Sequence, residues 1–538
     1  MVQGVTRSPR HGLTRMVAFW QGKPSNRLSA PTILILVASA LAQAVSISWP
    51  WGGIVDPGGT LPWLQCLAMG AFVAILNRCH SPRQAALAGL LFTTVWLCGV
   101  FWWLYVALHT YAGLPGIVAA IAIASLAAAL AFYYAAASYI YASRRGQRPW
   151  LASLLFAALW TGAEMARGTW LTGFGWGAAG YAHLDGWLAP YIPWLGAYGV
   201  TALTAWLAAN LAQLRSADRV SQSLSVIVLA VGAWASYAPL SWTKPHGDLQ
   251  VTLLQGNIPQ DEKFEPGSGV PVALGWYAEQ LQANRSPLVV APETAIPLLP
   301  QQLPEGYWKT MQQRFATGPQ AALIGFPLGS YQDGYTNSVL GFAPQATELW
   351  RYDKHHLVPF GEFIPPLFKW FTQMMNIPLG DFNRGALGQP SFAWAGQRLA
   401  ANICYEDLFG EELATRFVKV AEAPTIFVNI SNIGWFGDSI AIDQHLNISR
   451  MRALEFERPF VRATNTGATV IMDHRGRVTA SLPRATRGVL EGQVQGREGL
   501  TPFAWWASRW GLWPMWLAVL GVVTLAWYLK RRDSLSKA

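Results

Sequence analysis

Charged side chains are scarce in this sequence. Asp, Glu, Lys and Arg make up 13% of the 538 residues, against roughly 25% in an ordinary soluble domain, while hydrophobic residues make up 52%. This composition excludes a typical soluble enzyme. The 28 Trp and 17 Tyr residues indicate contact with a membrane, because these side chains gather at membrane–water interfaces.

Cysteine is also rare. The four copies are Cys66, Cys79, Cys98 and Cys404, with no Cys-x-x-Cys pair and no Cys/His spacing typical of zinc sites. The sequence therefore indicates neither a disulfide framework nor a metal site, and we expect no cofactor. Three of the cysteines lie in or beside apolar runs, which leaves Cys404 as the only one in a polar part of the chain.

Eight apolar runs approach the ~20 residues that a membrane-spanning helix needs. They lie at about 31–47, 61–76, 85–108, 116–142, 150–165, 191–214, 224–240 and 512–529. The first run could instead be a signal peptide, because Ala40-Leu41-Ala42 resembles a cleavage site. A retained first helix is the simpler interpretation, since seven further runs follow.

Basic residues fall in alternate loops between these runs. They are Arg78 and Arg83, then Arg144, Arg145 and Arg148, then Arg215 and Arg219, and finally 530–532. The loops at 50–60 and 109–115 contain no Lys or Arg. The positive-inside rule then predicts that both termini are cytoplasmic. Much of the net charge of +10 is therefore a topology signal, and we expect no nucleic-acid partner.

The chain divides into four predicted parts. Residues 1–29 form a basic cytoplasmic tail, 30–242 a membrane domain of seven helices, 243–499 a domain outside the cytoplasm, and 500–538 a last helix with a cytoplasmic tail. The third part alternates short β-rich runs with amphipathic stretches, notably 270–284 and 440–457. This alternation predicts a layered α/β domain. Its expected strands are 249–255, 287–291, 321–325, 338–342, 399–403, 425–429 and 469–472.

Three chemically active side chains stand at the ends of expected strands. Cys404 ends the run 399–403, and we expect a helix to begin near Glu406, so that its positive end favours the thiolate. The alternative is a buried structural Cys. Glu293 follows Leu-Val-Val-Ala-Pro, and Lys354 precedes His-His-Leu-Val-Pro. A carboxylate can accept the thiol proton, and an ammonium can stabilise the oxyanion that forms on attack.

Three segments carry a specific resemblance. Residues 291–297 (APETAIP), 354–363 (KHHLVPFGEF) and 402–407 (NICYED) resemble, in order, the signature segments of the nitrilase superfamily. Within it the chain resembles the apolipoprotein N-acyltransferase family, with further similarity at 255–260, 431–445, 450–455 and 462–465. The resemblance implies an α-β-β-α sandwich flanked by about eight membrane helices. It also implies a triad of Glu293 as general base and acid, Lys354 as oxyanion stabiliser and Cys404 as nucleophile.

The same resemblance assigns supporting residues. The backbone N–H of Tyr405 would help to bind the oxyanion, and Glu362 and Glu406 match further carboxylates of the family. Glu406 could instead simply stabilise a helix N-terminus, and Glu362 could orient Lys354.

Candidates for a lid or a lipid-facing rim are apolar. They are Phe264, Phe363, Trp435, Phe436 and the segment 365–368, with ordinary loop packing as the alternative. Two positions depart from the family pattern. Phe264 stands where a Trp is expected, and Ile433-Gly434 replaces the usual Asp-Ala before Trp435.

The implied reaction is acyl transfer in two halves, with a ping-pong mechanism. Cys404 would take an acyl chain from a phospholipid and pass it to the N-terminal α-amine of a diacylglyceryl-cysteine in an apolipoprotein. The implied partners are these two substrates and membrane lipids, and the implied location is a bacterial inner membrane with the catalytic domain in the periplasm. One alternative is a membrane-anchored amidase of the same superfamily. Another is a transporter, which predicts ionisable residues inside the helices.

Overall fold

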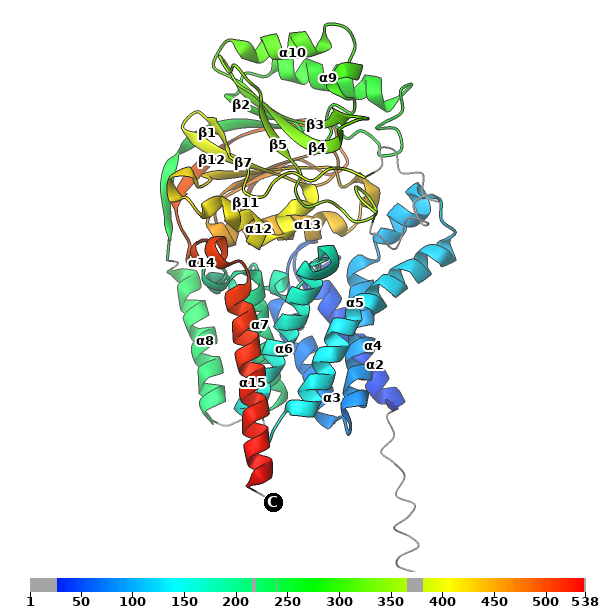
Figure 1. Ribbon diagram of the computed structural model, residues 1–538, viewed down its shortest axis with the longest axis vertical. Helices are drawn as coiled ribbons and strands as arrows, with labels where there is room; N and C mark the ends of the chain where they lie inside the picture. The colour runs from blue at the N-terminus through cyan, green and yellow to red at the C-terminus, as the bar shows by residue number, and fades with distance from the viewer. Residues whose placement is uncertain (1–26, 215–218, 239, 365–380, 537–538) are drawn as a thin grey trace, which may run out of the picture.

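The computed structural model describes residues 27–214, 219–238, 240–364 and 381–536 (Figure 1). A bundle of long helices forms its lower half, and a layered α/β domain stands on the bundle. The expected tail at 1–29 lies almost wholly outside the described residues, and so does the segment 365–368.

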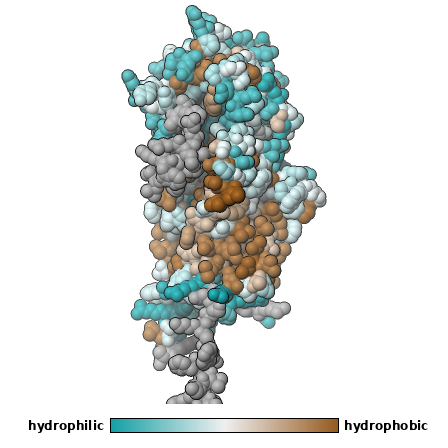
Figure 2. All heavy atoms as spheres, turned by 90° about the vertical axis from the view of Figure 1, so that its right-hand side faces the viewer, coloured by the Kyte–Doolittle hydropathy of each residue, from teal (hydrophilic) through white to brown (hydrophobic). Residues whose placement is uncertain are grey.

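Each of the eight apolar runs coincides with a helix. The helices are α2 (Ala30–Ser46), α3 (Pro62–Arg78), α4 (Pro82–Phe101), α5 (Gly116–Arg144), α6 (Pro149–Thr169), α7 (Ile192–Ala212), α8 (Arg219–Tyr237) and α15 (Trp513–Leu535). Within the described part of the chain, α4, α5, α7, α8 and α15 are long and apolar enough to cross a membrane. Figure 2 shows an apolar belt around the lower half of one face, with polar surface above and below it.

One apolar run does not form a helix over its whole length. The apolar stretch 85–108 does not form a single helix, because α4 ends at Phe101 and a π-helix, η2 (Val106–Tyr111), follows. Between them lies Trp103. Its Nε1 donates to Oε1 of Gln444, in the α/β domain, at 2.9 Å. The break in the helix thus coincides with a contact between the two halves of the molecule.

The α/β domain contains two six-stranded sheets packed face to face. In spatial order, one sheet is β12 (Gly488–Gly499), β1 (Thr243–Gln255), β2 (Leu288–Val290), β3 (Ala321–Ser330), β4 (Gly334–Phe342) and β5 (Trp350–Asp353). The other is β11 (Val478–Ser481), β10 (Val470–Met472), β9 (Phe460–Thr464), β8 (Ile426–Ser431), β7 (Gln397–Ile403) and β6 (Phe392–Trp394). All seven expected strands are present, and β5, β6, β9, β11 and β12 are additional.

Apolar side chains fill the space between the sheets, among them Leu253, Val290 and Leu323 from one and Ile403 and Val428 from the other. Helices α9 (Gly269–Ala283) and α10 (Tyr307–Ala316) cover the first sheet (Figure 1). Helices α12 (Gly410–Ala414) and α13 (Ala441–Phe456) lie beneath the second sheet. The predicted α-β-β-α sandwich is confirmed. Strands β1, β2 and β3 run parallel, as do β7, β8 and β9, so each trio ends at one edge.

The side chains of α13 join the sandwich to the helix bundle. Gln444 Oε1 accepts from Trp103 and also from Trp176 Nε1, at 2.8 Å. Glu455 Oε1 accepts from the backbone N–H of Ala197, in α7, at 2.7 Å. Because these polar groups are buried in an apolar setting, their bonds fix the orientation of one half on the other.

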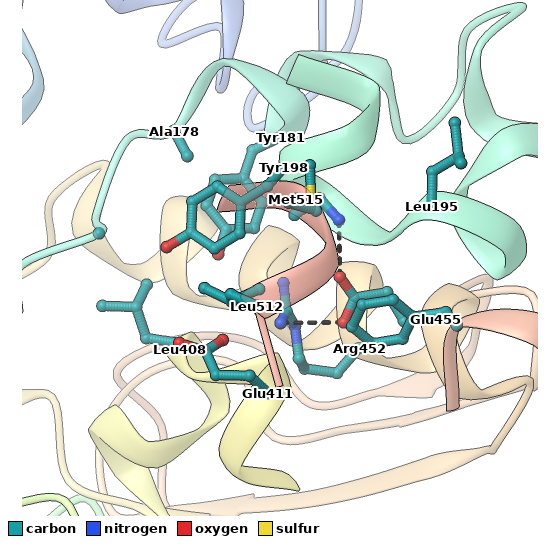
Figure 3. A pocket seen from close by; sticks show the side chains of 13 residues that line it. Ala178, Tyr181, Leu195, Tyr198, Leu408, Glu411, Arg452, Glu455, Leu512 and Met515 are labelled. Atoms are coloured by element: carbon teal, nitrogen blue, oxygen red, sulfur yellow. Dashed lines mark hydrogen bonds and ion pairs between the residues drawn. The ribbon is translucent and has the colours of Figure 1, made fainter. Parts of the chain in front are cut away.

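A small cavity of about 10 Å³ lies at this junction, which is enough for about one water molecule. Figure 3 shows Glu411, Arg452 and Glu455 around it, with Tyr198 and Met515 from the bundle. Arg452 Nη1 and Glu455 Oε2 form an ion pair at 2.9 Å. Glu411 therefore lies at this junction beside an existing ion pair.

Candidate active site

Three strand ends bring the predicted trio together. Glu293 follows β2 by three residues, Lys354 follows β5 directly, and Cys404 follows β7 directly. Lys354 Nζ lies 3.4 Å from Glu293 Oε1. The Cys404 thiol is close enough to both charges that each shifts its pKa. A nucleophile, a carboxylate and an ammonium therefore share one site, at the edge where parallel strands end.

Lys354 lies between two carboxylates. Its Nζ is 2.8 Å from Glu362 Oε2, closer than to Glu293, and the side chain is almost fully buried. Burial alone would lower the pKa of Lys354, but Glu362 and Glu293 outweigh it and raise that pKa. Asn337 Nδ2 donates to both carboxylates, at 2.7 and 2.8 Å, and so holds them on either side of the ammonium. The two carboxylates therefore favour the charged form of Lys354.

Cys404 does not have the environment that the sequence suggested. A 3-10 turn, η8 (Cys404–Leu408), follows the strand in place of a helix, and α12 after it is only five residues long. Burial and the Glu293 carboxylate raise the pKa of the Cys404 thiol, and Lys354 opposes them. The expectation of a helix end that favours the thiolate was wrong. Burial and the Glu293 charge therefore disfavour the thiolate form of Cys404.

The Glu293 carboxylate is held in position by several hydrogen bonds. Its Oε2 accepts from the backbone N–H of Asn432 at 2.8 Å, and its Oε1 accepts from Asn337. Its backbone carbonyl accepts from Lys263 Nζ at 2.9 Å. Burial lowers the pKa of Lys263 to about 8, against the opposing effects of Glu293 and Cys404. Several fixed donors therefore aim one carboxylate, which is what a general base requires.

Glu406 joins the two loops that carry Lys354 and Cys404. Its carboxylate accepts from the backbone N–H groups of Ile403 and His355, each at 2.6 Å, and from the Tyr352 hydroxyl at 2.8 Å. The alternative that Glu406 serves only its own helix is not what the structure shows. Glu362, likewise, accepts from the Val358 N–H at 2.9 Å in addition to its bond with Lys354.

The peptide group that joins Cys404 to Tyr405 is held at its carbonyl oxygen. Cys404 has a left-handed backbone with φ of 51°, which a non-glycine residue adopts only when its surroundings hold it there. Its carbonyl oxygen accepts from His445 Nε2 at 3.1 Å and from Asn429 Nδ2 at 3.3 Å. Because a trans peptide is planar, its N–H, on Tyr405, points away from these two donors. That N–H is the expected oxyanion donor.

His445 is itself held by charged neighbours. Arg462 Nη2 lies 3.2 Å from His445 Nδ1, and a guanidinium can only donate, so Nδ1 carries no proton. The proton is then on Nε2, which faces Cys404 O and also Asp407 Oδ1 at 3.1 Å. Burial alone would raise the pKa of Asp407, but His445, Arg462 and Ser449 outweigh it and lower that pKa. These buried hydrogen bonds therefore fix His445 in the tautomer that carries its proton on Nε2.

The apolar rim candidates are spread over the domain. Trp435 is 42% exposed and its ring packs on Tyr111, while Phe436 packs on Trp103 with ring centroids 4.3 Å apart. These two residues therefore touch the helix bundle. Phe264 is 38% exposed beside Lys263, and the ring of Phe363 lies 5.0 Å from the guanidinium of Arg384.

Four residues of the site carry roles that the sequence did not predict: Lys263, Asn337, Asn432 and His445. Asn432 and His445 fall within the segment 431–445 that resembles the family, so a signal was present for them. Lys263 adjoins Phe264, which was singled out for another reason. Asn337 lies within β4, and nothing in the sequence indicates its bonds. Across the part of the chain that the structure describes, no group of three His, Cys, Asp or Glu side chains could hold a metal ion.

Comparison with known protein families identifies two regions of the chain. Residues 250–502 match the family described as "Carbon-nitrogen hydrolase", and residues 57–210 match "Apolipoprotein N-acyltransferase N-terminal domain". Curated relatives named "Apolipoprotein N-acyltransferase" include one from Verminephrobacter eiseniae, 54% identical over 91% of this chain and 94% of its own length. Another, from Ralstonia nicotianae, is 45% identical over 82% of this chain and 85% of its own. The chain therefore belongs to the apolipoprotein N-acyltransferase family.

Among solved structures, a carbon–nitrogen hydrolase from Helicobacter pylori is similar to half of this chain and to 94% of its own, at 15% identity and a TM-score of 0.34. A mutant of an amidase from Nesterenkonia, described as reacting with acrylamide at its active-site cysteine, is similar to 45% of this chain and 92% of its own. Its sequence identity is 17% and its TM-score 0.32.

Proposed function

We propose that this protein transfers an acyl chain from a phospholipid to the N-terminal α-amine of diacylglyceryl-cysteine in apolipoproteins, through a thioester on Cys404. The observation that carries the proposal is the contact of Lys354 with Glu293 beside the Cys404 thiol, within a chain of this family. The relatives are named apolipoprotein N-acyltransferases, which supports transfer of an acyl group to a nitrogen of an apolipoprotein. The numerous apolar helices suit two lipid substrates, since moving a chain into water costs ~0.8 kcal/mol per CH₂.

In the first half-reaction, Glu293 takes the proton of the Cys404 thiol as the sulfur attacks the ester carbonyl. The Lys354 ammonium and the N–H of Tyr405 stabilise the oxyanion that forms. When this intermediate collapses, the ester C–O bond breaks, and Glu293 gives its proton to the departing alkoxide of the lysophospholipid. The thioester remains on Cys404, and Glu293 is a carboxylate again.

In the second half-reaction, the neutral α-amine attacks the thioester carbonyl through the same oxyanion. Glu293 takes a proton from the attacking nitrogen, the C–S bond breaks, and the thiolate leaves. Glu293 then protonates the thiolate, which restores the resting site. One carboxylate thus serves as base and acid in both halves, which gives a ping-pong mechanism.

The test is mass spectrometry of the purified protein after incubation with phospholipid. One acyl mass should appear on the peptide that contains Cys404, should be removed by hydroxylamine, and should be absent in Cys404→Ala. A diacylglyceryl peptide with a free amine should discharge it. Acylation of Cys66, Cys79 or Cys98 instead would refute the assignment, and release of ammonia from small amides would favour the amidase.

We also propose that the α/β domain is periplasmic and that both termini are cytoplasmic, in a bacterial inner membrane. Arginine-rich loops at the opposite end of the bundle support this orientation. A reporter that is active only in the periplasm should work when fused after Gly334 and fail when fused after Arg145. The reverse pattern would overturn the orientation.

A further inference from the structure

A second cleft lies at the base of the α/β domain, away from Cys404. It has a volume of about 340 Å³ and is lined by Lys244, Arg398, Arg458 and Glu498, with Val420 and Gly499. Arg398 stands near the start of β7, and Cys404 follows its end. Six residues of strand place the two about 20 Å apart. The cleft is therefore separate from the active site.

The cleft lies next to the helix bundle. Lys244 belongs to the first residues of β1, which pair with the last residues of β12, and α14 (Pro502–Trp510) begins three residues beyond β12. Figure 1 shows both strand ends meeting the tops of α8 and α14. Trp242, just before β1, packs edge-on against Trp194 at 4.7 Å. Tryptophans gather at the depth of lipid headgroups, so the cleft lies near that depth.

The side chains of the cleft carry more positive than negative charge. Glu498 is already paired, with Lys244 at 3.1 Å and with His246 at 3.0 Å. Arg398 Nε donates to the carbonyl of Ala423 at 2.6 Å, and Arg458 Nη2 donates to that of Gly499 at 2.6 Å. Within the described ranges, neither guanidinium forms an ion pair with a carboxylate.

Arg458 is completely buried, and burial lowers its pKa. An arginine stays protonated there. Its Nε, Nη1 and Nη2 already donate to backbone carbonyls, and its guanidinium lies 5.3 Å from the ring of Phe417, so it contributes a positive charge beneath the cleft rather than free donors. An anion in the cleft would compensate both positive charges, and a phosphate matches the geometry of the half-buried Arg398 guanidinium.

The loop beside the cleft is apolar and exposed. Val418 and Val420 are 51% and 52% exposed, on either side of Lys419. The turn just before them, η9 (Thr415–Phe417), packs against α14. Apolar side chains at this level can enter the boundary between headgroups and acyl chains. The cationic cleft and the valines therefore face the same layer of a membrane.

We propose that this cleft binds the phosphodiester of an anionic phospholipid, from the leaflet on which the α/β domain rests, through Arg398 and Lys244, with the buried charge of Arg458 behind them. The bound lipid seats the domain on the membrane and is not the acyl donor. This proposal does not depend on the transfer reaction.

Native mass spectrometry of the full chain, released from micelles that contain equal amounts of phosphatidylglycerol and phosphatidylcholine, tests the proposal. The wild type should retain phosphatidylglycerol in preference to phosphatidylcholine. Arg398→Gln should reduce this retention about 5-fold, which corresponds to the effect of one Arg near an anionic surface. Arg398→Lys should recover part of it. Lys309→Gln, with the same loss of charge on exposed α10, is the matched control and should behave as the wild type.

Two further measurements separate the explanations. Millimolar inorganic phosphate should leave the lipid bound, and displacement by it would show a site for free phosphate. Thioester formation on Cys404 from a soluble short-chain ester should be the same in Arg398→Gln and the wild type. Equal retention of both lipids, or unchanged retention in Arg398→Gln with its thermal unfolding midpoint intact, would overturn the proposal.

Discussion

Nε2 of His445 lies 3.1 Å from the backbone carbonyl oxygen of Cys404. The nucleophile is thus held through its main chain by a side chain from α13, the helix that also contacts the bundle through Gln444. Since Cys404 has a left-handed backbone, this bond and that of Asn429 fix the peptide group whose N–H, on Tyr405, is the proposed oxyanion donor. The first prediction concerns this relationship.

We predict that His445→Ala slows acylation of Cys404 by up to roughly 10²–10³-fold, the effect of losing one oxyanion donor. The loss should fall on kcat, with KM for phospholipid little changed, because His445 positions the Tyr405 N–H and does not touch substrate. His445→Gln, which keeps a donor, should recover part of the rate. His474→Gln, in a turn outside the site, is the control. A loss confined to KM would contradict the positioning role.

The second prediction follows from Glu411, at the junction cavity (Figure 3). Burial raises the pKa of Glu411 from 4.5 to about 7, with Glu412 adding to the rise and Arg452 opposing it. Between these pH values the folded protein keeps a proton that the unfolded chain has lost. This contribution to stability is complete below about pH 4.5 and is lost as the pH rises through 7.

Glu411→Gln is neutral at every pH and should not lose that contribution. Its thermal unfolding midpoint in detergent, relative to that of the wild type, should therefore increase from pH 5 to pH 8. Glu491→Gln makes the same change of charge at an exposed position of β12 and should show no such trend. A constant difference between Glu411→Gln and the wild type would mean that Glu411 does not titrate in this range.

Much of this architecture could be predicted from the sequence, because apolar runs and strand ends are local signals. The bundle helices and the positions of Glu293, Lys354 and Cys404 follow from such patterns. The hydrogen bonds that hold the side chains of the site join residues far apart in the sequence. Asn337 reaches Glu293 across 44 residues, and Trp103 reaches Gln444 across 341, so only the folded chain shows them. The short η8 turn was also missed, because the bonds of Glu406 to Tyr352 and His355 come from a distant part of the sequence.

The third prediction concerns Glu406, which ties the Cys404 turn to the loop of Lys354. Glu406→Gln keeps the size of the side chain but replaces one acceptor oxygen with an NH₂ group, which cannot accept from both Ile403 and His355. We expect both half-reactions to slow together, since both use the same loops. Glu412→Gln is the comparison, because Glu412 binds His356 rather than the nucleophile turn. Slowing of aminolysis alone would point to a role in acceptor binding.

The last prediction separates Glu293 from Lys354. The Glu293 charge raises the pKa of Cys404 and the Lys354 charge lowers it. Glu293→Gln removes the base, a loss of roughly 10²–10⁴-fold, but it also lowers the pKa of the thiol. Raising the pH should then form thiolate and recover part of the rate. Lys354→Met removes the oxyanion cation and raises the thiol pKa further, so alkali should recover little.

Single-turnover thioester formation against pH distinguishes the two variants, with folding checked by thermal unfolding. Lys354→Arg, which keeps a positive charge, is the companion to Lys354→Met. The assignment of roles fails if alkali restores Lys354→Met and not Glu293→Gln. If both respond alike, the carboxylate and the ammonium act as one coupled unit. Their 3.4 Å contact would then be the functional element, in place of either group alone.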